Sequence, residues 1–173
     1  MNFALAKDMK SPQEIVELWK AIRIETISWL NKVPDDKFQE RPTNRWSISE
    51  VAEHLYLSQW TTARPLPIIL AGKFGEDVGP QPNLEYEKIR ETFSKPSGVK
   101  NPEVVNPLNN YSKEEIFALL EKSEKKMEDA LKGKKREDLE KRGIPHPFFG
   151  LLNNFNFFWV MALHEYSHLV AIK

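Results

Sequence analysis

The chain has 173 residues, the length of one domain of ordinary size, and we expect a single domain over residues 1–173. It contains no cysteine, which excludes disulfides, thiolate ligands and cysteine nucleophiles. Its 25 Lys and Arg residues balance its 25 Asp and Glu residues, and this zero net charge argues against nucleic acid as a partner, because phosphate binding requires a basic surplus.

The chain shows no pattern that would direct it to a membrane. Its first residues lack the long apolar core of a signal peptide. Its most apolar stretch, residues 148–163, is shorter than the ~20 residues that a membrane span needs, and it holds three asparagines. We therefore expect a cytoplasmic protein without a membrane partner.

Two amphipathic helices are predicted in the N-terminal part of the chain. The first begins at residues 11–14, Ser-Pro-Gln-Glu, where Ser is the N-cap, Pro the first helical residue and Glu the reciprocal partner of a capping box. It ends before Pro34. The second begins at the Ser-x-x-Glu box of residues 47–50. Pro65 and Pro67 should kink this helix or end it early, because each removes a backbone donor and clashes with the preceding turn.

Two further helices are predicted after a long connection over residues 73–110, in which residues 83–93 have the pattern of a short helix. The third helix begins at a Ser-x-x-Glu box over residues 112–115 and is highly charged. The fourth runs from about residue 151 to the C-terminus, and Glu165 is its only charge before Lys173, which predicts a helix buried on most sides. No alternating strand pattern competes with these helices. We therefore predict an all-α four-helix bundle with a long crossover between helices two and three.

A histidine pair in the fourth helix is the strongest sign of chemistry. His164 and His168 are four residues apart, so both imidazoles lie on one helical face and can bind one borderline metal such as Zn²⁺. The alternative is two core or interface histidines satisfied by hydrogen bonds. The same residues match the His-Glu-x-x-His signature of zinc peptidases, but no downstream residue can supply the third ligand. A di-iron carboxylate site is also disfavoured, because the chain has only one Glu-x-x-His motif.

His54 is the candidate for a third ligand. It lies in the second helix at the edge of the apolar stripe, from where it can face the interior of the bundle. With the pair in the fourth helix it would give three nitrogen ligands and leave positions open, which is the layout of a catalytic zinc site. A lone histidine on such a face is also commonly a satisfied core residue.

Two blocks of the sequence resemble the DinB-like family. Residues 46–55, Trp-Ser-Ile-Ser-Glu-Val-Ala-Glu-His-Leu, are similar to its first block. Residues 144–153, Ile-Pro-His-Pro-Phe-Phe-Gly-Leu-Leu-Asn, followed by His164-x-x-x-His168, are similar to its closing block. The order also fits: one histidine in helix two, a long crossover, a charged helix three and a histidine pair in helix four. The resemblance spans about residues 11–173.

This resemblance implies a four-helix bundle with one zinc or nickel ion held by His54, His164 and His168. Relatives include thiol S-transferases that use bacillithiol, mycothiol or glutathione, in which the metal lowers the pKa of the cofactor thiol. The chain departs from the family where many relatives have Arg or His at Ser167 and Gln within residues 170–172. These departures leave the three ligands in place but affect the polar groups around them.

The remaining candidates are weaker. Glu50 and Glu165 are possible general bases, although the capping box already explains Glu50 and Glu165 lies about 100° around the helix from His164. His146, between two prolines, is expected to be structural or solvent-facing. The residues expected to line a pocket beside the histidines are Ser58, Thr61, Phe157 and Met161.

The sequence therefore predicts a metal-dependent enzyme that acts on a small molecule, with a divalent metal activating a thiol or water for S-transfer or hydrolysis. The alternative is a non-enzymatic metal-binding or stress-response bundle of the same family. Residues 73–110 are the candidate lid of the pocket. The apolar fourth helix leads us to expect a homodimer, and light scattering that shows only a monomer would contradict this expectation.

Overall fold

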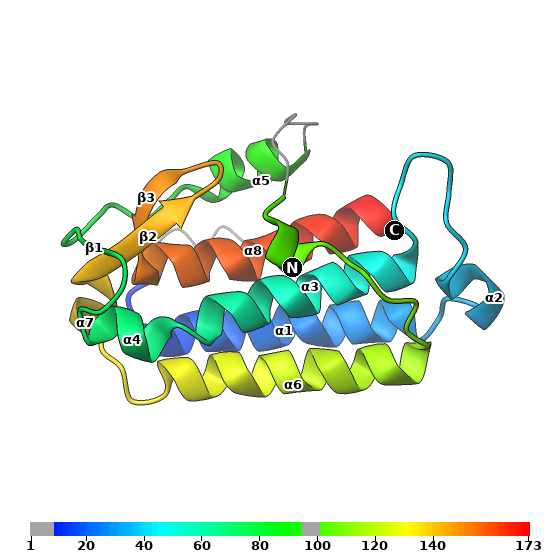
Figure 1. Cartoon of the computed structure of the whole chain (residues 1–173), viewed down its shortest axis with the longest axis horizontal. Helices are drawn as coiled ribbons and strands as arrows, with labels where there is room; N and C mark the ends of the chain where they lie inside the picture. The colour runs from blue at the N-terminus through cyan, green and yellow to red at the C-terminus, as the bar shows by residue number, and fades with distance from the viewer. Residues whose placement is uncertain (1–8, 95–100) are drawn as a thin grey trace.

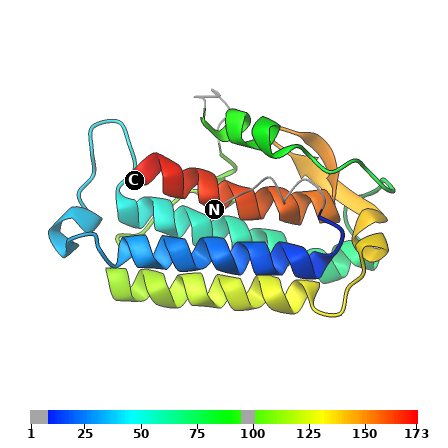
Figure 2. The same cartoon turned by 180° about the vertical axis from the view of Figure 1, so that it is seen from behind.

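The structure is a computed structural model that describes residues 9–94 and 101–173, and four long helices dominate this part of the chain (Figure 1). The elements in chain order are α1 (Pro12–Leu30), α2 (Asp35–Phe38), α3 (Ile48–Ala63), α4 (Leu66–Leu70), β1 (Glu76–Asp77), α5 (Tyr86–Ser94), η2 (Glu103–Val105), α6 (Lys113–Leu131), α7 (Arg136–Glu140), β2 (Arg142–His146), β3 (Gly150–Asn153) and α8 (Asn154–Ile172). Helices α3 and α6 run in one direction, and α1 and α8 run in the other (Figures 1 and 2). The predicted helical architecture is confirmed.

Serine caps fix where three of the long helices begin. Ser47 and Ser112 each accept a hydrogen bond from the backbone N–H three residues later, and the glutamate there accepts one from the serine N–H in return. Ser11 caps α1 in the same way, but the Glu14 carboxylate accepts from the N–H of Lys10 rather than from that of Ser11. The first capping box is thus shifted by one residue from its predicted form.

Prolines end α3 as the sequence predicts. The helix stops at Ala63, and the chain turns through Pro65 into the short helix α4. The short helix predicted over residues 83–93 is present as α5, one to three residues further along the chain. The segment between α4 and α6 thereby carries α5 over one face of the bundle, beside α8 (Figures 1 and 2).

The sequence predicts no strand, and this prediction is wrong. Strands β1, β2 and β3 form an antiparallel sheet in that order, with Gly143 paired to both Glu76 and Asn153. The burial of β2 does not alternate, because Gly143 and His146 are buried and the residues between them are not, so the pattern has no period of two. Glycine is required at position 143, since a Cβ there would lie 2.1 Å from the carbonyl oxygen of Leu152.

The fourth helix begins three residues later than predicted, because residues 150–153 belong to β3. Asn153 then caps α8 by accepting a hydrogen bond from the N–H of Asn156 at 2.9 Å. Residues 154–163 are all buried, since α8 packs against α1 and α3 and, on its other side, against α5 and the sheet. The prediction of a helix buried on most sides is confirmed.

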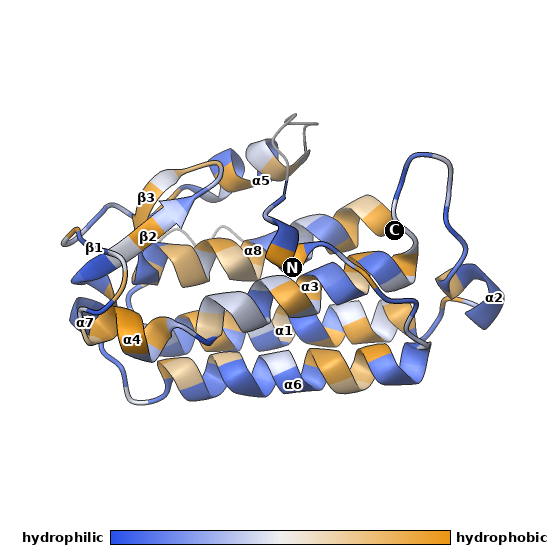
Figure 3. Cartoon of the chain, in the orientation of Figure 1, coloured by the Kyte–Doolittle hydropathy of each residue, from blue (hydrophilic) through white to orange (hydrophobic). Residues whose placement is uncertain are grey.

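Hydropathy follows this packing. The main hydrophobic cluster joins α1, α5, α8 and the hairpin formed by β2 and β3. A second cluster joins the end of α1 to α2, α3 and α6. Helix α6 presents apolar residues to the core and charged residues to the outside; the buried apolar residues are Ile116, Leu120, Met127 and Leu131. Hydrophobic and hydrophilic residues therefore alternate along this helix (Figure 3). Among the described residues, every helix is too short or too polar to cross a bilayer.

Candidate metal centre

Three histidine nitrogens from two helices meet between α3 and α8. Nε2 of His164 lies 3.3 Å from Nε2 of His54 and 3.0 Å from Nε2 of His168. The candidate ligand atoms of the three residues all lie within 4.8 Å of one another. The spacing of four residues puts His164 and His168 on one face of α8, and the packing of α3 on α8 brings His54 opposite that face. The predicted cluster is therefore formed.

A backbone contact fixes the proton on His54. Nδ1 of His54 lies 2.8 Å from the carbonyl oxygen of Val105 in η2. A carbonyl only accepts hydrogen bonds, so Nδ1 carries the hydrogen and Nε2 presents its lone pair to the other two histidines. The Trp46 ring packs against the imidazole with 5.0 Å between centroids. Hydrogen bonding of the second ring nitrogen in this way is what orients metal-ligating histidines.

All three imidazoles are neutral at pH 7. Burial lowers the pKa of His54 and of His168, the latter to about 3. Burial also lowers the pKa of His164 well below its usual value, and the neighbouring histidines lower it further. Neutral imidazole is the protonation state that binds a metal, so the site does not have to lose protons first.

The chemistry of this donor set fits a divalent metal. The Nε2 atom of His164 can form a hydrogen bond with only one of its two neighbours, because a ring nitrogen carries either one hydrogen or one lone pair. At least one of the two close N···N contacts is therefore left without a hydrogen bond. A shared cation would accept all three lone pairs, and borderline metals such as zinc and nickel favour imidazole.

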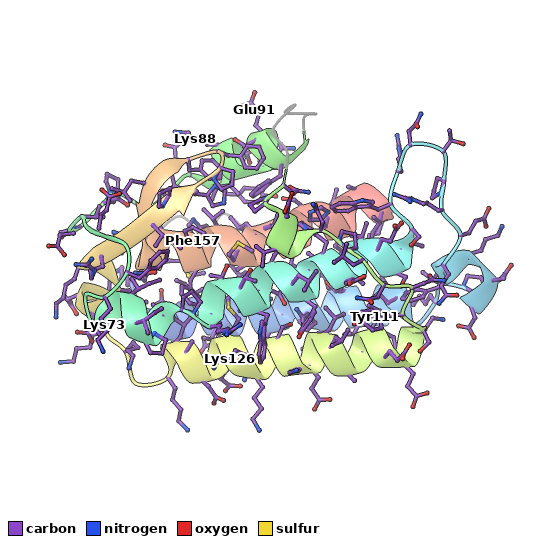
Figure 4. The ribbon with its side chains drawn as sticks, viewed as in Figure 1. Lys73, Lys88, Glu91, Tyr111, Lys126 and Phe157 are labelled. Atoms are coloured by element: carbon purple, nitrogen blue, oxygen red, sulfur yellow. The ribbon has the colours of Figure 1, made fainter. Side chains whose placement is uncertain are left out.

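Two hollows adjoin the histidine cluster. A cavity of about 290 Å³ is lined by His54 and His164, and a second hollow of about 220 Å³ is lined by all three histidines. The residues predicted to line a pocket are all in the wall of the first cavity: Ser58, Thr61, Phe157 and Met161. Phe157 lies between α8 and the sheet (Figure 4). Phe93 and Val105 bring the candidate lid into this wall, while residues 95–100 of that lid lie outside the described residues.

The family follows from a comparison of the sequence with known families. A model described as the DinB superfamily matches residues 10–172. The chain belongs to the DinB superfamily. Its structure is similar to the crystal structure of TT2238, a four-helix bundle protein, with a TM-score of 0.61 and 22% sequence identity over 93% of this chain and 97% of that one. At this identity the similarity shows the fold alone. No curated protein matches the sequence.

Glu165 of this DinB-superfamily chain turns away from the three histidines. Its side chain is fully buried and accepts hydrogen bonds from Trp19 Nε1 at 2.7 Å, from Arg23 Nε and Nη2 at 2.8 Å, and from Gln59 Nε2 at 2.6 Å. Burial alone would raise the pKa of this carboxyl, but Arg23 and these donors outweigh it and hold the pKa below its usual value. A carboxylate engaged in this way holds helices together and is not placed to take a proton from a substrate.

Glu50, the other candidate base, is also engaged elsewhere. Its carboxylate accepts the hydrogen bond from the N–H of Ser47 that completes the α3 capping box, at 2.7 Å. It also lies 3.4 Å from Nε of Arg41. Glu50 is absent from the walls of both hollows beside the histidines. The structure thus places both glutamates in structural contacts.

His146 is a buried residue, which agrees with the structural one of the two roles that the sequence predicts for it. It is only 8% exposed and lines the cavity beside His54 and His164. Its neighbours in sequence are prolines, which favoured a loop, but the residue closes strand β2 and packs among phenylalanine rings. The aromatic pair Phe148 and Phe149, two and three residues further along, is the sequence signal that indicates a buried position.

His146 should make the metal-free protein less stable in acid. Burial lowers its pKa from 6.5 to about 4. Between these pH values the unfolded chain binds a proton that the folded chain does not, so stability is complete above about pH 6.5 and falls as the pH decreases. The decrease attributable to His146 is on the order of 3 kcal/mol by pH 4. Urea unfolding from pH 7 to 4.5 in EDTA should show a smaller decrease for His146→Phe, and equal decreases would contradict this.

Proposed function

We propose that this protein is a metal-dependent enzyme that activates a thiol cofactor or water for S-transfer or hydrolysis on a small molecule. The observation that carries this proposal is the convergence of three neutral imidazole nitrogens beside a cavity. His54, His164 and His168 would hold the metal, which we expect to be zinc or nickel from the nitrogen donor set. When bound, such an ion supplies Lewis-acid chemistry, lowering the pKa of a coordinating thiol or water.

The number of protein ligands supports catalysis over a purely structural role. Structural zinc sites are normally closed by four protein ligands, whereas catalytic sites keep a position open. Within the described residues, the cluster offers three ligands and no fourth histidine or carboxylate joins it. The histidines line two hollows that could admit a small molecule beside such an ion.

The residues in the walls of both hollows support a nucleophile that is generated at the metal. Among the described residues that line them there is no aspartate, glutamate, lysine or arginine. No carboxylate among these described residues is thus in place to act as a general base, and the chain has no cysteine. A nucleophile generated at the metal would not need either of them. Thiol transfer suits this arrangement because the cofactor brings its own sulfur.

The chain's own residues have positioning roles in this proposal. The carbonyl oxygen of Val105 holds the His54 ring by its Nδ1–H, so that Nε2 faces the site. Phe93, Phe157 and Met161 form an apolar wall that would keep bulk water out. The hydroxyl of Thr61 donates to the Leu57 carbonyl at 2.7 Å, which leaves its oxygen free to accept from a ligand.

A conjugation assay tests the proposal. Protein purified without a histidine tag is loaded with zinc or nickel and given monochlorobimane with glutathione, bacillithiol or mycothiol. The thiol sulfur forms a bond to carbon as the C–Cl bond breaks, releasing chloride and a proton. Hydrolysis of 4-nitrophenyl acetate is measured in parallel. We expect His54→Ala to lower kcat/KM at least ~100-fold while the fold persists, since ligand loss should exceed the 10–100-fold effect of losing an outer contact.

The control for this assay is Lys20→Ala, a surface change on α1 that should leave the rate unaltered. Loaded wild-type protein that accelerates neither thiol transfer nor ester hydrolysis would contradict an enzymatic function. Tight metal binding combined with that result would instead support the non-enzymatic bundle.

A further inference from the structure

His146 places an imidazole in the wall of the cavity that also contains His54 and His164. The ring of Phe93 connects the two ends of this wall, with its centroid 5.1 Å from that of His164 and 6.4 Å from that of His146. His146 is outside the three-histidine cluster, so the proposed metal centre does not use it. A buried imidazole beside a candidate active site needs another explanation.

The position of the proton on His146 follows from its hydrogen bond. The backbone N–H of Phe148 donates to Nδ1 of His146 at 3.2 Å. Because Nδ1 accepts, it carries no hydrogen, and the neutral ring must have its hydrogen on Nε2. Burial keeps the ring neutral by lowering its pKa to about 4. His146 is therefore a fixed donor with its N–H at the far side of the ring from the backbone contact.

This N–H is free to meet a ligand. In the part of the chain that the structure describes, the contact with Phe148 is the only hydrogen bond of the His146 ring. No fully buried side-chain nitrogen or oxygen in that part lacks a partner, so Nε2 is not sealed inside the protein. The residue is 92% buried and belongs to the lining of the cavity, so the cavity is the space beside it where a ligand could be held. A donor left unpaired in an apolar wall favours a ligand that carries an acceptor.

The surroundings of His146 restrict what that ligand can be. Four phenylalanine rings have centroids 5.0–6.4 Å from its own: Phe93, Phe148, Phe149 and Phe157. The described lining of the cavity contains no formally charged side chain. Aromatic walls without charges favour an uncharged and largely apolar molecule, and a cavity of about 290 Å³ limits it to a small one.

We propose that Nε2–H of His146 donates a hydrogen bond to an oxygen of an uncharged, mostly apolar substrate, and so orients its reactive end toward the histidine cluster. The oxygen would belong to a carbonyl, ester or epoxide group, which accepts hydrogen bonds without carrying charge. This inference deepens the proposed function and rests on it for the identity of the cavity as the substrate site. His146 is then a substrate-binding donor that determines which small molecules the cavity selects.

A matched pair of probes tests this donor directly. Acetophenone and α-methylstyrene have nearly the same shape, but only the ketone has an oxygen acceptor. Their affinities are measured by ligand-observed NMR titration for wild-type protein, His146→Phe and His146→Gln, with circular dichroism to verify folding. Wild-type protein should bind the ketone about tenfold more tightly, as expected for one buried hydrogen bond. His146→Phe should lose the preference for the ketone or reverse it, because the ketone oxygen would be buried there without a donor. His146→Gln, which retains an N–H donor, should recover part of the preference.

Repeating the titrations with zinc-loaded and EDTA-treated protein separates His146 from the metal. The preference for the ketone should be the same in both, because the donor belongs to the chain. A preference that survives in His146→Phe, or that requires zinc, would overturn the proposal. So would equal affinities in wild-type protein or no binding of either probe. These binding ratios do not depend on turnover, so failure of the catalytic assay leaves them interpretable.

Discussion

Replacing Arg23 with methionine is expected to cost about 3–5 kcal/mol of folding free energy, because it leaves the Glu165 carboxylate buried without its ionic partner. Arg23 is 3% exposed and Glu165 is 0% exposed. The two side chains make two hydrogen bonds of 2.8 Å with each other. In a domain of this length the loss corresponds to a decrease in Tm of roughly 6–20 °C. Thermal and urea unfolding at pH 7, where Glu165 is ionised in the wild-type protein, measure the effect.

The size of this effect comes from the network around the pair. Arg23 also donates to the carbonyl oxygen of Leu120 at 2.5 Å and to Oε1 of Gln59 at 2.6 Å. Ser123 donates to the same Gln59 oxygen at 2.7 Å. The network therefore joins α1, α3, α6 and α8, and removing its only cation leaves several groups without a partner in a region that water does not reach.

Two further variants show whether pairing is the cause. Lys20→Met changes a residue on the same helix as Arg23 and breaks an exposed ion pair with Glu128 of α6, in which Nζ lies 2.9 Å from the carboxylate. It should leave Tm close to that of the wild-type protein. The double variant Arg23→Met/Glu165→Gln removes the charge as well as its partner and should be more stable than Arg23→Met alone. A double variant that is less stable than Arg23→Met would show that the unpaired carboxylate is not the source of the loss.

This network also bears on the site, because Glu165 lies next to His164 in the chain. Its four hydrogen bonds fix the rotation of α8 about its axis, so one face is held toward Arg23 and the adjacent face, with His164 and His168, is held toward His54. Glu165 is best understood as a positioning residue for the histidine pair. The prediction of Glu165 as a general base followed from its place in a His-Glu-x-x-His motif. In the structure this carboxylate instead accepts hydrogen bonds from the helices packed against α8.

The sequence predicts well those features that depend on local rules. The serine caps, the break at Pro65 and the face shared by His164 and His168 follow from contacts within a few residues. The partner of Glu165 could not be predicted in this way, because Arg23 is 142 positions away in the chain. Nothing in the sequence distinguishes Arg23 from the other basic residues as the one that is buried. The hairpin that carries His146 was missed for a similar reason: its strands are short and are stabilised by pairing and by burial against α8.

Replacing His164 with alanine is expected to remove the metal from the protein. His164 contacts both other histidines through the same nitrogen, so its loss removes the central ligand and leaves only two, His54 and His168, on different helices. The affinity should fall at least ~100-fold, because loss of an outer contact alone costs 10–100-fold. Elemental analysis of untagged protein after dialysis should find about one zinc or nickel per chain in the wild-type protein and almost none in the variant.

Stability provides a second measure of the same site, one that does not require any enzymatic activity. Metal present at 100 times its Kd should stabilise wild-type protein by about 2.7 kcal/mol, which raises Tm by roughly 5–11 °C. His164→Ala should show no such increase, whereas His146→Phe should retain both the metal and the increase, since His146 is outside the cluster. Metal retained in His164→Ala, or lost in His146→Phe, would mean that the ion is held by a different set of residues.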